Sequence, residues 1–380
     1  DPDDKAAREI ADGCEPTADL ATRLAFARAF RLQASRACLP YLPRLLVDAP
    51  PALQSDVARV MLAIPDPSHA PYLIQMLGTR RARPIARDAL FAIGDEGLNA
   101  LADALPRSDL PRQLRAHIPR SISRFDSVRA TDVLLDQLEH EADGWVRFKI
   151  IRGLGQLRAQ MRDPSRMRRA TAIARQNLLR AVHFMAWRLA DQRDQASDPH
   201  LATPGGELLV AALLDKESHA VDRAVRLVGL ASGPDIIHDI RRALAGRDRR
   251  RRADSIEVLV SESPPDVARA LAALLDDAPD MVRMARAADA LHESLATGNY
   301  EARLDAMLSD ESEAVRSVAA FHVGELGLTS LAPSFSNAAA RSSDLSSEVF
   351  ARVARLLGRA SLDNVGLQPL AAGPLGGQRS

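Results

Sequence analysis

A short motif that returns about every 31 residues constrains this chain more than any other feature. It consists of an acidic turn, an apolar residue, an arginine and then an amphipathic helix, as in Asp280-Met281-Val282-Arg283. Related versions are Asp143-Gly144-Trp145-Val146-Arg147 and Ser312-Glu313-Ala314-Val315-Arg316. A fixed period of this length is typical of helix pairs that stack in one direction. The sequence therefore predicts an all-α fold, a right-handed α-solenoid of about nine helix pairs with one long helical insertion.

Each residue type in the motif has a physical role. An acid before a helix accepts bonds from free amide groups and meets the positive end of the helix dipole. The valine packs inward, and we expect the arginine to pair with an acid of an adjacent repeat. Such exposed pairs contribute under roughly 1 kcal/mol each, so they set register more than stability. The predicted ladder consists of Asp143, Arg147, Asp280, Arg283, Glu313 and Arg316.

The period divides the chain into five predicted ranges. These are a disordered lead-in over 1–20, repeats over 21–157, an insertion over 158–204, repeats over 205–358 and a disordered tail over 359–380. Pro119 falls inside a second helix and should kink or break it. Within the insertion, apolar residues at three- and four-residue steps predict a helix over 165–193, followed by a mobile loop over 194–206. When the repeats resume, a second helix should begin near Ala220.

Two segments depart from the motif. Asp222 occupies the position of the arginine in one repeat, and Arg250–Arg252 replace the valine in another. The arginine ladder is not expected to continue through these repeats.

Composition bounds the function. Lys+Arg and Asp+Glu both number 50, so no net field steers the chain to nucleic acid. No apolar run is long enough to span a bilayer. The two cysteines, Cys14 and Cys38, cannot build a disulfide framework or a zinc site, and free thiols indicate a reducing, cytoplasmic location. The chain begins Asp1-Pro2 without methionine, which we interpret as a segment of a longer protein.

The repeats resemble HEAT repeats, in particular the short bacterial kind related to phycobilisome-lyase HEAT-like repeats. The resemblance rests on prolines in first helices (Pro40, Pro71), on turn acids, and on the Val-Arg pairs that open second helices, and it covers roughly 35–157 and 205–358. It implies about nine HEAT-like helix pairs that bind a protein partner through the concave surface. Lyase-type activity is disfavoured, because a tetrapyrrole needs an aromatic-lined pocket and aromatic content is 4%.

A weaker resemblance concerns residues 146–158, the insertion and residues 249–260. Their order is similar to the cytoplasmic HEAT-repeat region of nucleotide-transporter-like membrane proteins of the major facilitator type. This resemblance implies a regulatory region that is associated with a membrane domain of the same parent chain.

Two groups of residues are candidate contacts with a partner. The first is a basic cluster that would bind phosphate, nucleic acid or an anionic membrane, unless it is a solvated turn. The second lies on the insertion and would dock a partner, unless it packs on its own solenoid. The clusters are Arg241, Arg242, Arg247, Arg249, Arg250, Arg251 and Arg252, and Phe184, Trp187 and Arg188.

Motifs for catalysis are missing from the sequence. HExxH, P-loop, GxSxG and GxGxxG are absent, and the histidines are scattered. We therefore predict no catalytic, cofactor-binding or metal-binding residues, and a non-enzymatic interaction scaffold. The alternatives are a cytosolic regulatory region of a transporter-like protein and an accessory to a lyase-type enzyme.

Overall fold

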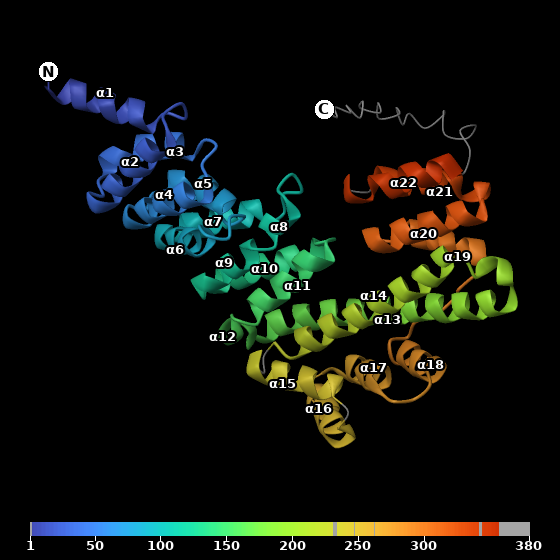
Figure 1. Ribbon diagram of the computed structural model, residues 1–380. Coiled ribbons are helices and arrows are strands. Elements are labelled where there is room, and N and C mark those ends of the chain that lie inside the picture. Colours follow the sequence, from blue (N-terminus) through green and yellow to red (C-terminus); the bar gives the residue numbers. More distant parts are fainter. Residues whose placement is uncertain (1, 231–233, 247, 262, 342–343, 357–380) are drawn as a thin grey trace. The chain divides into compact units, whose positions relative to one another are not determined.

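The computed structural model describes residues 2–230, 234–246, 248–261, 263–341 and 344–356. These residues form helices joined by turns, with no strand among them (Figure 1). The prediction of an all-α fold is confirmed. The predicted tail over 359–380 and Arg247 lie outside the described residues.

The chain divides into two compact units, each made of two segments. Unit 1 contains residues 1–174 and 223–263, and unit 2 contains residues 175–222 and 264–380. The chain leaves unit 1 within α13 (Pro164–Ser197) and returns within α14 (Pro204–Val228). The units therefore do not coincide with the predicted repeat ranges 21–157 and 205–358.

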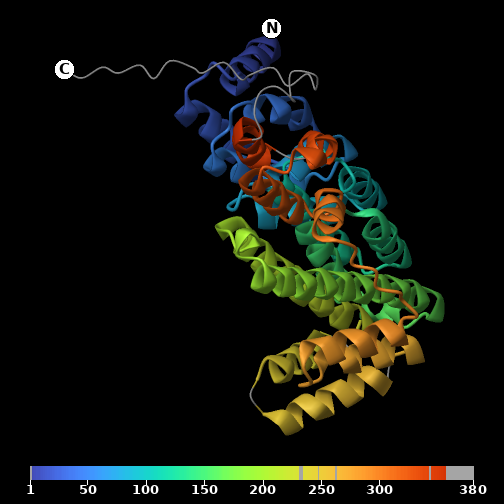
Figure 2. The same cartoon turned by 90° about the vertical axis from the view of Figure 1, so that its right-hand side faces the viewer.

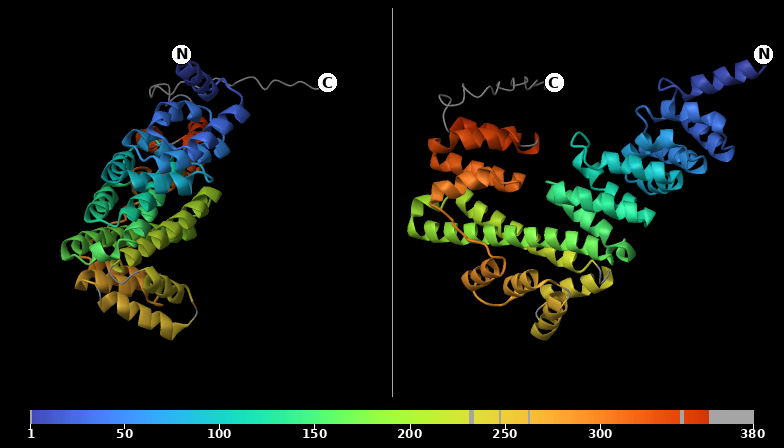
Figure 3. Two further views of the ribbon diagram at one scale, coloured as in Figure 1. Left: turned by 90° about the vertical axis from the view of Figure 1, so that its left-hand side faces the viewer. Right: turned by 180° about the vertical axis from the view of Figure 1, so that it is seen from behind.

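Unit 1 is a stack of short helices, in which the second helix of each pair packs on the second helix of the next pair. Helix α2 contacts α4, α4 contacts α6, α6 contacts α9, and α9 contacts α11 (Figures 1 and 3). Three 3-10 turns, η1 (Arg36–Tyr41), η2 (Pro67–His69) and η3 (Ser123–Phe125), connect these elements. The helices are α1 (Pro2–Cys14), α2 (Leu20–Leu32), α3 (Leu42–Leu46), α4 (Pro51–Ala63), α5 (Ala70–Met76), α6 (Arg83–Ile93), α7 (Asp95–Ala104), α8 (Arg112–Arg115), α9 (Ile118–Ile122), α10 (Val128–His140), α11 (Gly144–Leu154), α12 (Arg158–Met161), α15 (Pro234–Ala245) and α16 (Arg249–Ser261).

Local sequence explains where these helices begin and end. Helix α4 starts at Pro51, a favoured first residue, and buries Leu53, Val57 and Met61 along one side. Pro119 separates α8 from α9, as predicted. The disordered lead-in is wrong, because residues 2–14 form α1. This helix packs on α2 and buries Cys14 completely, which offsets the entropy cost of ordering the end of the chain.

Unit 2 is built around the parts of α13 and α14 that belong to it. The pairs α17–α18 and α19–α22 lie on opposite sides of these two helices (Figures 1 and 2). Phe184, Leu213, Leu304, Val315 and Phe335 belong to one buried apolar cluster that joins α13 and α14 to α19, α20 and α21. The remaining elements are η4 (Pro199–Leu201), α17 (Pro265–Leu275), α18 (Asp280–Ala290), α19 (Tyr300–Leu308), α20 (Glu313–Leu326), η5 (Thr329–Leu331), α21 (Ala332–Ala340) and α22 (Asp344–Leu356).

The insertion is more helical than its sequence indicated. The long helix is present, but α13 continues to Ser197, and α14 begins at Pro204, so most of the predicted loop over 194–206 is helical or forms η4. The helix start expected near Ala220 is also wrong, because α14 is continuous over 25 residues. Leu209, Leu213 and Ala220 are fully buried at helical spacing, and no proline or glycine interrupts them.

Arg283 and Arg316, two arginines of the predicted ladder, bind backbone carbonyls instead of an acid of an adjacent repeat. In each repeat where the bond is seen, the guanidinium donates to a carbonyl at the end of the preceding helix, where carbonyls lack a helical partner. Arg252 keeps this role although its repeat departs from the motif. The bonds are Arg83 to Leu77 (2.6 Å), Arg115 to Leu105 (3.0 Å), Arg252 to Leu244 (3.0 Å), Arg283 to Leu274, and Arg316 to Asp310 (2.8 Å).

The acids of the predicted ladder play three different roles. Asp143 caps α11, as predicted, by accepting from the amides of Trp145 (2.7 Å) and Val146 (3.0 Å), and it pairs with Arg112 one repeat earlier (2.5 Å). Asp280 pairs with Arg283 within its own helix, at 3.0 Å. Glu313 accepts a bond from Ser346, and Arg147 lies half-buried on α11.

Two arginines on α8 provide a matched test of these contacts. The Arg115 side chain is 11% exposed and pairs with Glu141, which is 4% exposed, at 2.5 Å. We expect Arg115→Leu to lower the free energy of unfolding by about 3 kcal/mol, because it leaves a buried carboxylate without its cation. Chemical denaturation monitored by circular dichroism measures the change.

Arg112→Leu is the control for this prediction. Arg112 also pairs with an acid of the next repeat, but its side chain is 58% exposed, so the loss should stay below about 1 kcal/mol. Equal losses in the two variants would contradict the importance of burial. The double variant Arg115→Leu/Glu141→Leu should recover part of the loss.

Candidate functional site

A row of positive charges crosses three neighbouring helices of unit 1. Arg87 on α6, Arg120 on α9 and Arg152 on α11 occupy equivalent positions one repeat apart, and His117 and Lys149 form a second such pair. Arg120 and Arg152 are exposed, and Lys149 and His117 are half-buried. We call this set, together with Arg83, Trp145 and Phe148, the cationic surface.

Close helix packing holds the cationic surface together. Gly153 of α11 lies against α9, and a Cβ atom there would come within 3.1 Å of the Pro119 carbonyl and 3.2 Å of the Leu134 side chain. Glycine therefore permits an approach of α11 to α9 that a larger residue would oppose. On the other side, the Arg87 Nε atom donates to the Ser121 hydroxyl at 3.2 Å and ties α6 to α9.

Aromatic rings flank the charges on α11. The Trp145 and Phe148 rings stack with centroids 5.6 Å apart and an interplanar angle of 17°. The Lys149 Nζ atom lies 4.2 Å from the Trp145 centroid, and the Arg226 guanidinium lies 4.9 Å from the Phe148 centroid. These distances are within the range of cation–π attraction. Trp145 is still 45% exposed, so one large ring is open to a ligand.

The electrostatics of the cationic surface are one-sided. Burial and, after it, the charges of Arg83, Arg87, Lys149 and Arg120 together lower the pKa of His117 to about 4. Burial also lowers the pKa of Lys149, assisted by Arg152 and Arg120. Every charge that acts on these two residues is positive. An anion bound here would therefore relieve repulsion that the folded chain carries by itself.

The acids near the surface are engaged elsewhere. Asp88 pairs with Arg124, and Glu141 and Asp143 pair with the two arginines of α8. Within the described residues, no salt bridge joins Arg83, Arg120, Lys149 or Arg152 to a carboxylate.

The neighbouring helix α4 marks the end of the surface. There Asp56 lies 2.7 Å from Arg59, 3.6 Å from Arg28 and 3.8 Å from Arg31, so one acid serves three arginines. An acid therefore lies among the arginines at α4, which distinguishes this helix from α6, α9 and α11.

The predicted basic cluster lies around the turn between α15 and α16. Arg249, Arg250 and Arg251 are exposed, and Asp248 caps the amides of Arg250 and Arg251 and pairs with the Arg251 side chain at 3.5 Å. Arg242 contacts His238 at 3.0 Å, and Arg241 is half-buried. No aromatic ring lies over these guanidinium groups within the part of the chain that the structure describes. The cluster is a charged turn with its own acid.

The predicted docking residues of the insertion lie inside unit 2. Phe184 is buried in the apolar cluster, and the partly buried Trp187 packs against that cluster. Arg188 is buried and donates to Glu217 at 3.0 Å and Asp280 at 2.8 Å. These three side chains therefore pack within unit 2, and the hypothesis that they dock a partner is not supported.

Unit 2 also contains a buried ion pair, Arg303–Asp191, and a group of polar side chains beside it. Arg303 and Asp191 are 1% and 0% exposed and lie 2.8 Å apart, and burial raises the pKa of Asp191 to about 6. The Tyr300 hydroxyl contacts His322 at 2.6 Å, and Thr203 contacts the other ring nitrogen at 2.9 Å. The cluster ties the turn between α13 and α14 to α19 and α20, and we assign it a structural role.

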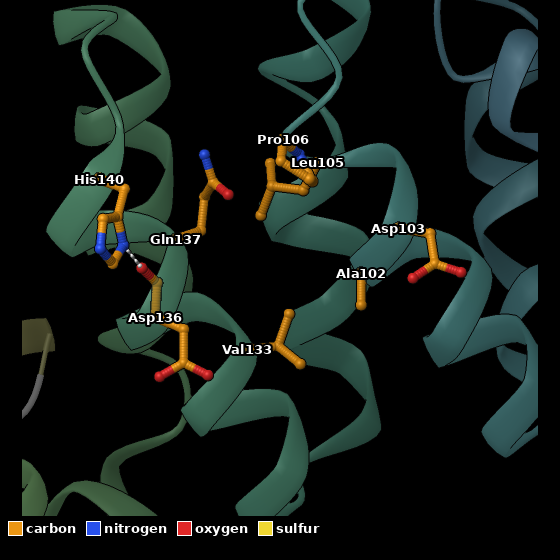
Figure 4. Close-up of a pocket in the computed structure, with 8 residues that line it drawn as sticks. All are labelled: Ala102, Asp103, Leu105, Pro106, Val133, Asp136, Gln137 and His140. Carbon is orange, nitrogen blue, oxygen red and sulfur yellow. Dashed lines mark hydrogen bonds between the residues drawn. The ribbon is translucent and has the colours of Figure 1, made fainter.

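Other candidate sites offer less. The groove between α7 and α10 is lined by eight residues, and its acid Asp136 already pairs with Arg169 at 2.6 Å (Figure 4). Burial raises the pKa of the Cys14 thiol to about 11, which keeps it protonated. Among the described residues there is no group of three metal-binding side chains, and no helix is long and apolar enough to cross a bilayer.

The cationic surface was not recognised in the sequence, although a signal existed. Its charges are single residues in three separate repeats, whereas the contiguous run Arg249–Arg252 attracts attention. Aligning the repeats would have placed Arg87, Arg120 and Arg152 in one column, in which only Arg87 has an acid, Asp88, as its neighbour in sequence.

The pKa of His117 leads to a prediction about stability. Its folded pKa of about 4 lies below the ordinary value of 6.5, so its contribution to stability is complete above pH 6.5 and is lost as pH falls toward 4. We expect wild-type protein to lose more stability than His117→Gln between pH 7 and pH 4.5. Denaturation curves at the two pH values measure this, and parallel losses would contradict it.

Comparison with known proteins does not supply a function for this surface. The chain matches no protein-family model, and no curated protein matches it.

Proposed function

We propose that this chain is a non-enzymatic, cytoplasmic interaction scaffold made of HEAT-like repeats in an α-solenoid. It binds a protein partner through the surface lined by the second helices of its repeats, and the cationic surface on α6, α9 and α11 is the contact. The partner presents an acidic segment. The observation that carries the proposal is a cluster of cations, four of which form no ion pair with a carboxylate of the described residues, beside an exposed tryptophan.

The stacking of helices in unit 1 supports a repeat scaffold. Because α4, α6, α9 and α11 pack in succession, side chains at equivalent positions of different repeats come together on one surface. Extended surfaces of this kind are the usual binding surfaces of solenoid proteins.

The composition of the surface supports an acidic partner. Opposite charge steers association and rejects unsuitable partners, and each exposed pair adds under about 1 kcal/mol. A partly exposed tryptophan is the residue type that most often supplies 2 kcal/mol or more to an interface. Trp145 beside Lys149 and Arg152 combines the two contributions.

A triple substitution tests the proposal against a charge-matched control. Arg120→Ser/Lys149→Ser/Arg152→Ser removes three exposed or half-exposed cations from the cationic surface. Arg249→Ser/Arg250→Ser/Arg251→Ser removes the same charge from the start of α16, outside it. The ligand is a synthetic glutamate-rich peptide, and fluorescence anisotropy or tryptophan fluorescence measures its binding.

We expect the first variant to weaken binding by about tenfold or more, the sum of three modest pairs, and the second to change it by less than about twofold. Equal losses would mean that net charge alone matters and would overturn the proposal. Binding by wild-type protein that does not weaken with salt would also overturn it. Unchanged helical circular dichroism confirms that both variants are folded.

A further inference from the structure

The balance of charge in the cationic surface identifies the kind of acidic group that fits it. Arg83, Arg87, Arg120 and Lys149 act on one half-buried histidine, and Arg152 acts on Lys149. A single carboxylate carries one charge, so it would leave most of this repulsion in place. A phosphate monoester carries close to two charges at neutral pH and three strong acceptor oxygens.

The donors also suit a phosphate. Arginine presents a planar fork of N–H groups that binds phosphate oxygens in pairs, and lysine adds a point charge. Arg120 and Arg152 come from adjacent helices, α9 and α11, whose close contact at Gly153 brings their exposed side chains onto one surface. The stacked rings of Trp145 and Phe148 provide an apolar platform beside these charges for the residues that flank the phosphate.

We propose that the cationic surface recognises a phosphorylated side chain within the partner's acidic segment. This inference rests on the function proposed above and names the group that is recognised. The surface is compact: it covers α6, α9 and α11, and on the next helix, α4, the acid Asp56 lies among Arg28, Arg31 and Arg59, where it would repel a phosphate backbone. Nucleic acid binds along an extended line of cations, so compactness favours a single phosphorylated residue.

His117 provides an internal reporter for the phosphate. Burial and, after it, the surrounding cations lower its pKa, so the imidazole is neutral at pH 7. A bound dianion offsets part of this positive field, so the imidazole becomes easier to protonate and can donate to the phosphate. A glutamate bound in the same place would have a smaller effect because it carries less charge.

The experiment compares peptides of one sequence with the full chain. One peptide contains a central phosphothreonine, one replaces it and a neighbour with glutamates to match the net charge, and one is unphosphorylated. We expect the phosphopeptide to bind at least about tenfold more tightly than the charge-matched peptide, as two-point charge-assisted hydrogen bonds require. Calorimetry at pH 7.5, where the phosphate is a dianion, gives the affinities.

Two further measurements distinguish recognition of the phosphate group from attraction to any negatively charged peptide. Nuclear magnetic resonance should show the titration midpoint of His117 rising from about 4 with the phosphopeptide, and less with the glutamate peptide. Arg120→Lys keeps the charge but loses the planar pair of guanidinium donors. It should weaken binding of the phosphopeptide and change the affinity for the glutamate peptide by less than about twofold.

Each outcome distinguishes the two proposals. Equal affinity for the phosphopeptide and the glutamate peptide, both lost in the triple variant, overturns phosphate recognition and keeps the acidic-partner scaffold. Phosphopeptide binding that survives the triple variant overturns both. Tighter binding to a single-stranded oligonucleotide of equal charge, or to phosphatidic acid vesicles, overturns recognition of a phosphorylated protein segment.

Discussion

In unit 1, helices α4, α6 and α9 each pack between two other helices: the second helix of the preceding repeat and the second helix of the following one. The other features of the unit depend on the apolar surface that this packing buries. Buried residues such as Val57, Leu90 and Ile150 contribute about 2 kcal/mol each, more than any exposed ion pair of the chain. The arginines of the motif then stabilise the turns, because they donate hydrogen bonds to carbonyl groups at the C-terminal end of the preceding helix. Because these residues face inward or toward the turns, other positions of each helix remain available to build a surface.

The distribution of acids decides where that surface carries charge. On α4, Asp56 pairs with three arginines, whereas on α6, α9 and α11 the nearby acids are engaged at the turns or with Arg124. Cations that repel one another lower the stability of the folded chain, and residues at odds with stability are most often found at functional sites. The cationic surface also differs from the equally basic start of α16, where Asp248 caps the helix and pairs with Arg251.

Much of the fold follows from the sequence, and the failures have physical causes. The period, the cap at Asp143 and the break at Pro119 depend on nearby residues, so they could be predicted. The arginines were assigned to acids because sequence does not show which backbone groups a packed turn leaves free. The continuity of α14 was missed because the repeat pattern was extended through a stretch whose buried Leu213 and Ala220 follow one unbroken helical spacing. The cationic surface unites residues from three repeats, and only packing brings them together.

The interleaving of the two units has a consequence for synthesis of the chain. Residues 223–263 belong to unit 1 but follow residues 175–222, which belong to unit 2. A ribosome therefore finishes unit 1 only after it has made the first segment of its neighbour. The first segment of unit 1, residues 1–174, must wait for its second segment, residues 223–263, to emerge before the unit is complete. During this interval the nascent chain offers chaperones a target that a simple tandem array of repeats would not.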